Sequence, residues 1–215
     1  MNKNKAEKHL RDWFALIPKT DPPLLEVKSD GVTPIIPAGP QPRLCCSKPL
    51  VNTVAALAAT IIADWKGPRL IEGVSYFVYR RDSNGDIDPL YVGIANSSNK
   101  KGAKLSSLWR MRGARFCDGY ESNGHVDCLS RSLFEGHKGY ANWVTKLFGP
   151  GVASGGLVAP RLLQPVFVHF ELWNSSAHRI LPEVPAAPLY VEEMLRLWTL
   201  KSAGYGEQLL NRDGN

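Results

Sequence analysis

The architecture of this chain is set by residues 73–96, which read GVSYFVYRRDSNGDIDPLYVGIAN. Residues 74–79 are β-branched or aromatic for the most part, which predicts a strand. Residues 82–86 contain Asp, Ser and an Asn-Gly pair, the composition typical of a hairpin turn. Residues 90–94 then predict the returning strand. The segment therefore predicts one antiparallel hairpin.

Outward from the hairpin, residues 166–172 alternate again between apolar and polar side chains and predict a third strand. Apolar residues at helical spacing predict helices over 4–17, 52–65, 104–111, 130–148 and 191–201. The predicted fold class is therefore α+β: a small antiparallel sheet with a three-stranded core, flanked by helices.

The distribution of proline suggests two regions. Residues 18–49 hold many of the 16 prolines of the chain and show no regular period, which indicates an extended linker or arm. We therefore predict an N-terminal extension over residues 1–70, made of helices and this linker. Residues 71–215 are predicted to form the main domain, with a long insertion at about 113–160.

The composition is that of a globular protein. Hydrophobic residues make up 44% and charged residues 21% of the 215 positions, which excludes a coiled coil, a collagen and a wholly disordered chain. The formal net charge is +6, which permits a polyanionic partner without requiring one.

Positive charge is densest between residues 100 and 115, where no acidic residue occurs. A run of this kind is compatible with a solvated helix face and with a nucleic-acid contact, and both interpretations stay open. Under the second interpretation, the residues predicted to bind nucleic acid are Lys100, Lys101, Lys104 and Arg115.

The cysteines and the apolar segments bear on localisation. None of the four cysteines forms a CxxC pair, and residues 1–8 are basic and polar, unlike a signal peptide. The apolar run over 50–62 is too short to span a membrane and is soon followed by Asp64. We expect a cytoplasmic protein with no membrane partner.

Two short motifs within the hairpin carry a family resemblance. They are Gly73-Val74-Ser75-Tyr76, in which Ser75 is an inserted residue, and Tyr91-Val92-Gly93. A predicted arginine-bearing helix, a helix with Val191-Glu192 and a terminal Leu210-Asn211 follow in that order. Together they resemble the GIY-YIG nucleases over roughly residues 71–213. The resemblance implies that the two motifs lie on neighbouring strands of a small antiparallel sheet.

The same resemblance implies a set of catalytic residues. Tyr76 would accept a proton from the attacking water, and Tyr91 would orient the water or the phosphate. Arg110 would stabilise the charge on the phosphorus, with Arg112 close enough to take its place. Asn211 would brace the site.

The resemblance also implies a metal ion, Mg²⁺ or Mn²⁺, held by Glu192. One carboxylate is enough to hold Mg²⁺, which keeps most of its waters. Helical periodicity does not separate Glu192 from its neighbour Glu193, so either remains a candidate.

These expectations together predict a metal-dependent endonuclease that hydrolyses phosphodiester bonds in double-stranded DNA, of the type II restriction kind. A palindromic target would suit a symmetric homodimer. The alternatives are a structure-specific, mobile-element or toxin-type nuclease of the same fold, or a nucleic-acid-binding module without catalysis.

Overall fold

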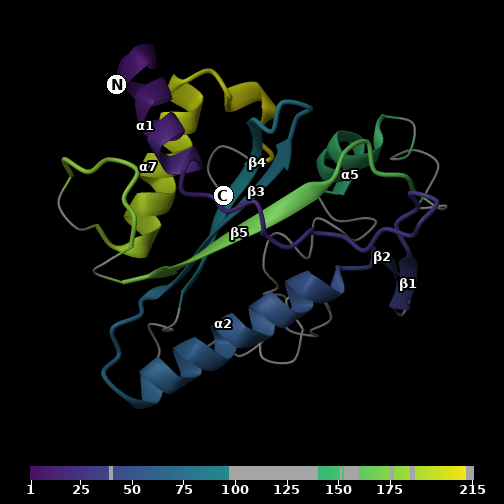
Figure 1. The fold of residues 1–215 in the computed structure, drawn as a ribbon, viewed down its shortest axis with the longest axis horizontal. Coiled ribbons are helices and arrows are strands. Elements are labelled where there is room, and N and C mark those ends of the chain that lie inside the picture. The colour runs from purple at the N-terminus through teal and green to yellow at the C-terminus, as the bar shows by residue number, and fades with distance from the viewer. Residues whose placement is uncertain are drawn as a thin grey trace.

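The core of the protein is a three-stranded antiparallel sheet (Figure 1). The computed structural model describes residues 1–38, 41–96, 140–150, 152, 160–174, 177–184 and 187–211. Within them, β3 (Gly73–Arg81) lies between β4 (Ile87–Asn96) and β5 (Val166–Trp173). The predicted hairpin and the predicted third strand are both confirmed.

The turn between β3 and β4 is closed by the residues that predicted it. The Asp82 Oδ1 atom accepts hydrogen bonds from the backbone N–H groups of Asn84 (2.8 Å) and Asp86 (2.9 Å). Gly85 has φ +87°, a conformation that glycine adopts without steric cost. The side chain of Arg80 also pairs with that of Asp88 across the hairpin, so that the two strands continue beyond the lengths predicted from the sequence.

Side chains alternate between the two faces of the sheet, and helices cover both. The helices α1 (Lys3–Phe14) and α7 (Leu189–Ser202) pack on the face that contains Phe77 and Tyr79. The helices α2 (Lys48–Lys66) and α5 (Tyr140–Phe148) pack on the face that contains Tyr76 and Val78. The described part of the chain is therefore an α+β fold with helices on either side of its sheet.

Capping residues explain where two of the helices begin. The Asn2 Oδ1 atom accepts a hydrogen bond from Lys5 N (2.9 Å) at the start of α1. The Ser47 Oγ atom accepts one from Leu50 N (3.1 Å) at the start of α2, four residues before the start predicted from apolar spacing. Helix α7 agrees with its prediction to within two residues at either end. The predicted helix over 104–111 and the first ten residues of the one predicted over 130–148 lie outside the described residues.

Part of the proline-rich segment 18–49 is hydrogen-bonded to the sheet. It contains a two-stranded antiparallel pair, β1 (Ile35–Ala38) and β2 (Gln41–Leu44), which the sequence pattern did not predict. Leu24 N donates to Val166 O (2.7 Å) and Val168 N donates to Pro22 O (3.0 Å), so part of the segment runs along β5. Both α1 and α2 share core clusters with residues after 70. The domain boundary at residue 70 stays a prediction.

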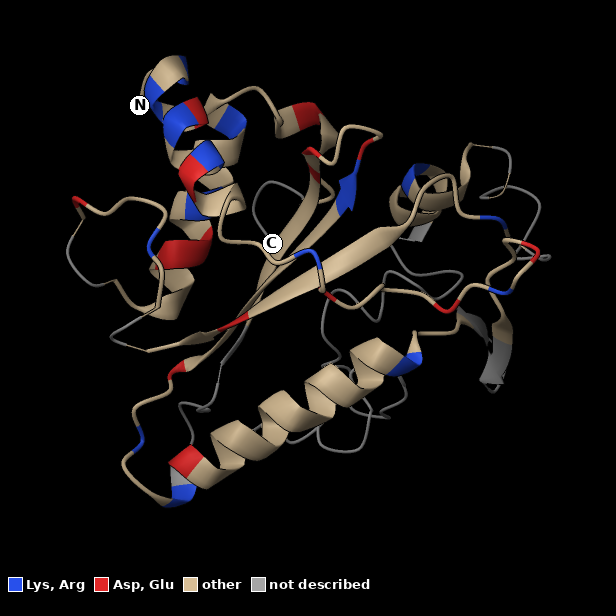
Figure 2. Cartoon of the chain, viewed as in Figure 1, with Lys and Arg blue, Asp and Glu red and all other residues tan. Residues whose placement is uncertain are grey.

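Charge is unevenly placed on the helices (Figure 2). Helix α2 carries charged residues only at position 48 and in its last three positions, although much of its length is exposed. None of the described helices is both long enough and apolar enough to cross a membrane.

Candidate functional site

Two buried tyrosines lie side by side on neighbouring strands. Tyr76 of β3 and Tyr91 of β4 have ring centroids 5.9 Å apart, with the ring planes 24° from parallel. Tyr76 is 2% exposed and Tyr91 is 9% exposed. Phe170 of β5 and Trp143 of α5 flank the pair, with ring centroids 6.3 Å from Tyr76 and 5.6 Å from Tyr91, respectively. The two motifs of the sequence therefore bring their phenol rings together on the face that α2 and α5 cover.

Gly93 is required by this arrangement. It is the register partner of Tyr76, and the Tyr76 ring lies directly over its Cα. A Cβ atom at position 93 would lie 2.3 Å from Tyr76 Cζ and 2.5 Å from Tyr76 Oη. Side-chain atoms essentially never approach so closely, so a substitution would force the ring or the strand to move. The glycine of the second motif thus allows the tyrosine of the first to lie across β4.

Asn211 lies against the outer edge of β4, beside Val92, the middle residue of the second motif. Its Oδ1 atom accepts a hydrogen bond from Val92 N (2.9 Å), and its Nδ2 atom donates one to Val92 O (2.7 Å). Leu210 N donates to Leu90 O (2.7 Å) just before it. The Asn211 amide therefore holds the C-terminal segment to the strand that carries Tyr91 and Gly93.

Glu192 lies on the other side of the sheet from the tyrosines. It is 1% exposed, and its Oε1 atom accepts hydrogen bonds from Arg196 Nε (2.9 Å) and Ile180 N (2.8 Å). Arg196 in turn donates to Ser75 Oγ (2.9 Å), and Ser75 points to the face opposite its neighbour Tyr76. The structure thus brings Tyr76, Tyr91 and Asn211 together and places Glu192 in a separate buried cluster.

Arg196 is the centre of that cluster, and the sequence analysis did not single it out. Its guanidinium is 1% exposed, donates to Glu171 Oε2 (2.7 Å) and His178 O (2.9 Å), and lies over the rings of Trp13 and Trp173. The Glu192-x-x-x-Arg196 spacing, which places the two side chains on one helix face, is the signal that predicts this pair. The cluster also accounts for the inserted Ser75, whose hydroxyl completes it.

Glu193 has a different environment from its neighbour. Successive residues of a helix are turned by about 100°, so Glu193 does not share the position of Glu192, and it is partly rather than fully buried. Burial raises the pKa of the Glu193 carboxyl from 4.5 to about 7. Within the described part of the chain, the structure gives this carboxyl no hydrogen bond.

The remaining predicted residues cannot be placed. Both arginines of the predicted helix, Arg110 and Arg112, lie outside the described residues, as do Lys100, Lys101, Lys104 and Arg115. Among the described residues, no group of three or more His, Cys, Asp or Glu side chains is arranged to hold a metal ion.

Comparisons with known proteins identify no relative. No protein-family model matches the chain, and neither a curated protein nor a solved structure matches it. The resemblance to the GIY-YIG nucleases therefore depends on the motifs themselves and on what the fold does with them.

Proposed function

We propose that this chain is a metal-dependent DNA endonuclease of the GIY-YIG kind. The observation that carries the proposal is the stacked pair of Tyr76 and Tyr91, with the Tyr76 ring over Gly93. The Asn211 amide binds Val92, which lies between Tyr91 and Gly93 on β4. The glycine that lets the Tyr76 ring lie across β4 is the one in the second motif. The three-stranded antiparallel sheet agrees with the resemblance at the coarser level.

The proposed roles follow from what each side chain can do. The Tyr76 side chain, ionised to the phenolate by neighbouring cations, accepts a proton from the attacking water, and the Tyr91 hydroxyl orients that water or the phosphate. An arginine from the segment 110–112 supplies positive charge at the phosphate. Asn211 acts on the site indirectly, because its amide fixes the position of Val92 between Tyr91 and Gly93.

The metal ion, Mg²⁺ or Mn²⁺, would supply Lewis-acid stabilisation of the phosphate oxygens. The surroundings of Glu192 fit it poorly as the ligand, because this carboxylate is 1% exposed and already accepts two hydrogen bonds. Glu193 fits better, since a half-buried carboxyl with a raised pKa gains most from a neighbouring cation. Of the two carboxylates we propose Glu193, the alternative that the sequence left open, although its helix α7 packs on the face of the sheet opposite the tyrosine pair.

The test is cleavage of a plasmid of known sequence with Mg²⁺ or Mn²⁺ by the wild type and matched variants. Tyr76→Phe removes one hydroxyl from the proposed site, and Tyr79→Phe removes one from a buried tyrosine on the opposite face of the sheet. We expect Tyr76→Phe to lower the rate about 10²–10⁴-fold, the usual contribution of a general base, and Tyr79→Phe to retain it. Equal rates from both variants, or cleavage without a divalent cation, would refute the proposal.

Two further variants decide the metal ligand. We expect Glu193→Gln to lower the rate and to raise the metal concentration needed for half-maximal cleavage, and Glu192→Gln to lower thermal stability more than the rate per folded molecule. The opposite pattern would return the metal to Glu192.

The products of the same assay define the kind of nuclease. We propose a type II restriction enzyme acting on double-stranded DNA, for which discrete fragments are the expected result. A smear would indicate a nuclease without sequence specificity. DNA binding without cleavage would indicate a binding module.

A further inference from the structure

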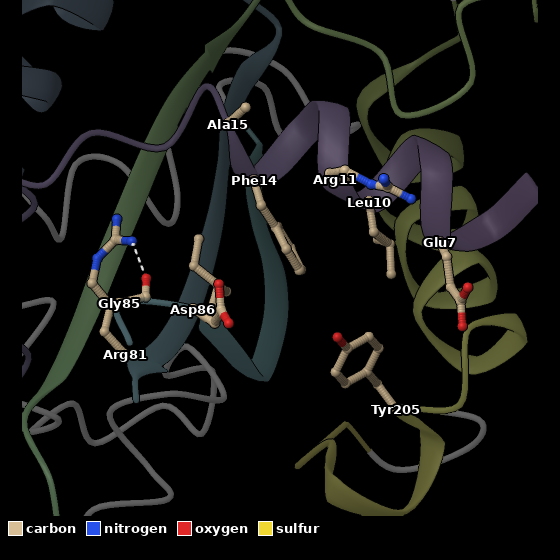
Figure 3. Close-up of a pocket in the computed structure, with 10 residues that line it drawn as sticks. Glu7, Leu10, Arg11, Phe14, Ala15, Arg81, Gly85, Asp86 and Tyr205 are labelled. Carbon is tan, nitrogen blue, oxygen red and sulfur yellow. Dashed lines mark hydrogen bonds between the residues drawn. The ribbon is translucent and has the colours of Figure 1, made fainter. Parts of the chain in front are cut away.

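A cavity of about 560 Å³ lies well away from the tyrosine pair, between α1, the β3–β4 turn and the residue Tyr205 that follows α7 (Figure 3). This volume is within the range of about 300–1,000 Å³ that small-molecule sites occupy. Its apolar wall includes Leu10, which is 2% exposed, and Ile87, which is 9% exposed. Three segments far apart in the sequence therefore enclose one space on the α1 side of the sheet.

Two aromatic rings and two carboxylates face this space. Figure 3 shows the ring of Phe14 reaching in from α1 and the hydroxyl of Tyr205 directed into the space beneath it. Glu7 of α1 and Asp86 of the turn lie on either side of Tyr205. Among the described residues, Glu7 pairs only with Lys3, at 3.8 Å, and both side chains are well exposed. Aromatic faces combined with carboxylates are the surroundings that stabilise an organic cation.

Two arginines also line the cavity, and neither guanidinium is directed at Tyr205. Arg81 donates to the carbonyl oxygens of Gly85 (3.0 Å), Ile17 (3.4 Å) and Pro18 (3.3 Å), and its guanidinium is turned away from Tyr205 (Figure 3). Arg11 extends along the exposed side of α1.

The balance of charge at Tyr205 agrees with this. Burial raises the pKa of the Tyr205 phenol, and the negative charges of Asp88, Glu7 and Asp86 raise it further. Three carboxylates therefore lie close enough to the hydroxyl to favour a cation beside it.

From this geometry we propose that the cavity binds an organic cation, an alkylammonium or guanidinium group, between Phe14 and Tyr205 and beside Glu7 and Asp86. An apolar ligand would remove water from two carboxylates and leave them without partners. A bare metal ion is disfavoured, because no group of three ligating side chains converges in the described part of the chain. The cation can be a free amine or the Lys or Arg side chain of a partner protein, since both present the same chemistry.

The first test is calorimetric titration of the full chain with agmatine, which carries one ammonium and one guanidinium group, in a buffer free of amines. We expect binding that Glu7→Gln and Asp86→Asn each weaken by about 5–30-fold, the loss of one contact of ordinary strength. Asp86→Asn leaves the turn intact, because the hydrogen bond to Asp82 comes from the Asp86 backbone. The matched control is Glu207→Gln, which removes the same charge from an exposed residue outside the cavity.

Two variants of Tyr205 separate the ring from its hydroxyl. Tyr205→Phe keeps the aromatic face and is expected to bind agmatine almost as the wild type does, whereas Tyr205→Leu is expected to bind several-fold more weakly. Melting curves of all variants verify that the chain is folded. The proposal is overturned if agmatine does not bind, or if Glu207→Gln weakens binding as much as the two cavity variants.

A second titration identifies the source of the cation. A capped Ala-Arg-Ala peptide presents a guanidinium as a partner protein would. If it binds at least as tightly as agmatine, and with the same dependence on Glu7 and Asp86, the natural ligand is a protein side chain. If only agmatine binds, the ligand is a free amine. Both titrations measure binding alone, so their outcome does not depend on whether the chain cleaves DNA.

Discussion

At Gly93, the addition of a single methyl group would disturb the packing of the tyrosine pair. Gly93→Ala adds one methyl group, which would lie 2.3 Å from Tyr76 Cζ. Because Tyr76 is 2% exposed and packed between Tyr91 and Phe170, its ring has little room to move. We expect a loss of about 1–3 kcal/mol in the free energy of unfolding, the usual cost of overpacking, measured by urea denaturation.

The control for this prediction is Gly206→Ala. A Cβ atom there would meet nothing closer than 3.6 Å, on the side chain of Lys201. The expected change in stability is therefore small. Wild-type stability of Gly93→Ala would show that the ring does not need the space above the glycine.

Glu193 makes stability depend on pH. Its pKa is about 7 in the folded chain, against 4.5 as the ordinary value. As the pH rises from 4.5 to 7, the unfolded chain loses its proton first, so the folded state becomes progressively less stable and changes no further above that range. In the metal-free protein, we expect the urea midpoint of the wild type to fall more between about pH 5 and pH 8 than that of Glu193→Gln. Parallel curves for the two proteins would contradict a raised pKa at this residue.

At the scale of elements, Arg196 joins α7 to two strands of the sheet. It binds Glu192 on its own helix, Ser75 on β3 and Glu171 on β5. Arg196→Met would leave Glu192 buried and without its counter-charge, and we expect a loss of about 3–5 kcal/mol in the free energy of unfolding, measured by chemical denaturation. Because the cost comes from the unpaired carboxylate, the double variant Arg196→Met/Glu192→Leu should recover a large part of it.

Lys201→Met is the matched control for the Arg196 variant. It removes the same charge from an exposed position on the same helix, and a change below about 0.5 kcal/mol is expected. If Arg196→Met were as mild as this control, the buried cluster would not be what holds α7 in place.

Local signals predicted the strands well, and they failed where partners are distant. The alternation of side chains was enough to predict β3, β4 and β5. Each of these strands packs one face against the core cluster on one side of the sheet and the other face against the cluster on the opposite side. The prediction for β4 began only at Leu90, whereas the strand begins at Ile87 and includes Pro89, which fits beside the shift in register between Val78 and Tyr79. The β1–β2 pair has no alternating pattern, so nothing in its sequence distinguishes it from a linker.

The candidate site shows the same contrast. The sequence placed Tyr76 and Tyr91 on neighbouring strands of one hairpin, but the pairing of Tyr76 with Gly93 depends on the register shift between Val78 and Tyr79, which the turn does not predict. The choice between Glu192 and Glu193 could not be made, since it depends on which side of α7 faces Ser75 of β3 and Glu171 of β5. The amide of Asn211 reaches Val92 across more than a hundred residues of chain, and no local pattern encodes that contact.

At the scale of the whole molecule, helix α1 completes the core on one face of the sheet. Trp13 is 1% exposed, and its ring centroid lies 4.7 Å from that of Phe77 and 4.7 Å from the Arg196 guanidinium carbon. We expect Trp13→Ala to cost about 3–5 kcal/mol in the free energy of unfolding, with exposed apolar surface detected by dye binding.

The control is Leu16→Ala, just after the same helix, where the side chain is 56% exposed and little stability should be lost. If Trp13→Ala were as stable as this control, the N-terminal extension would be a detachable arm, as its proline-rich composition first indicated.

The two hydrogen bonds of Asn211 have one more consequence for the whole molecule. Strand β4 lies at the border of its sheet, where a free peptide group invites pairing with a strand from another molecule. The side-chain amide accepts a hydrogen bond from the N–H of Val92 and donates one to its C=O, as a neighbouring strand would. The backbone N–H of Leu210 donates to the carbonyl of Leu90. The last few residues of the fold thus shield the sheet from joining with copies of itself, and their loss would expose a surface prone to aggregation.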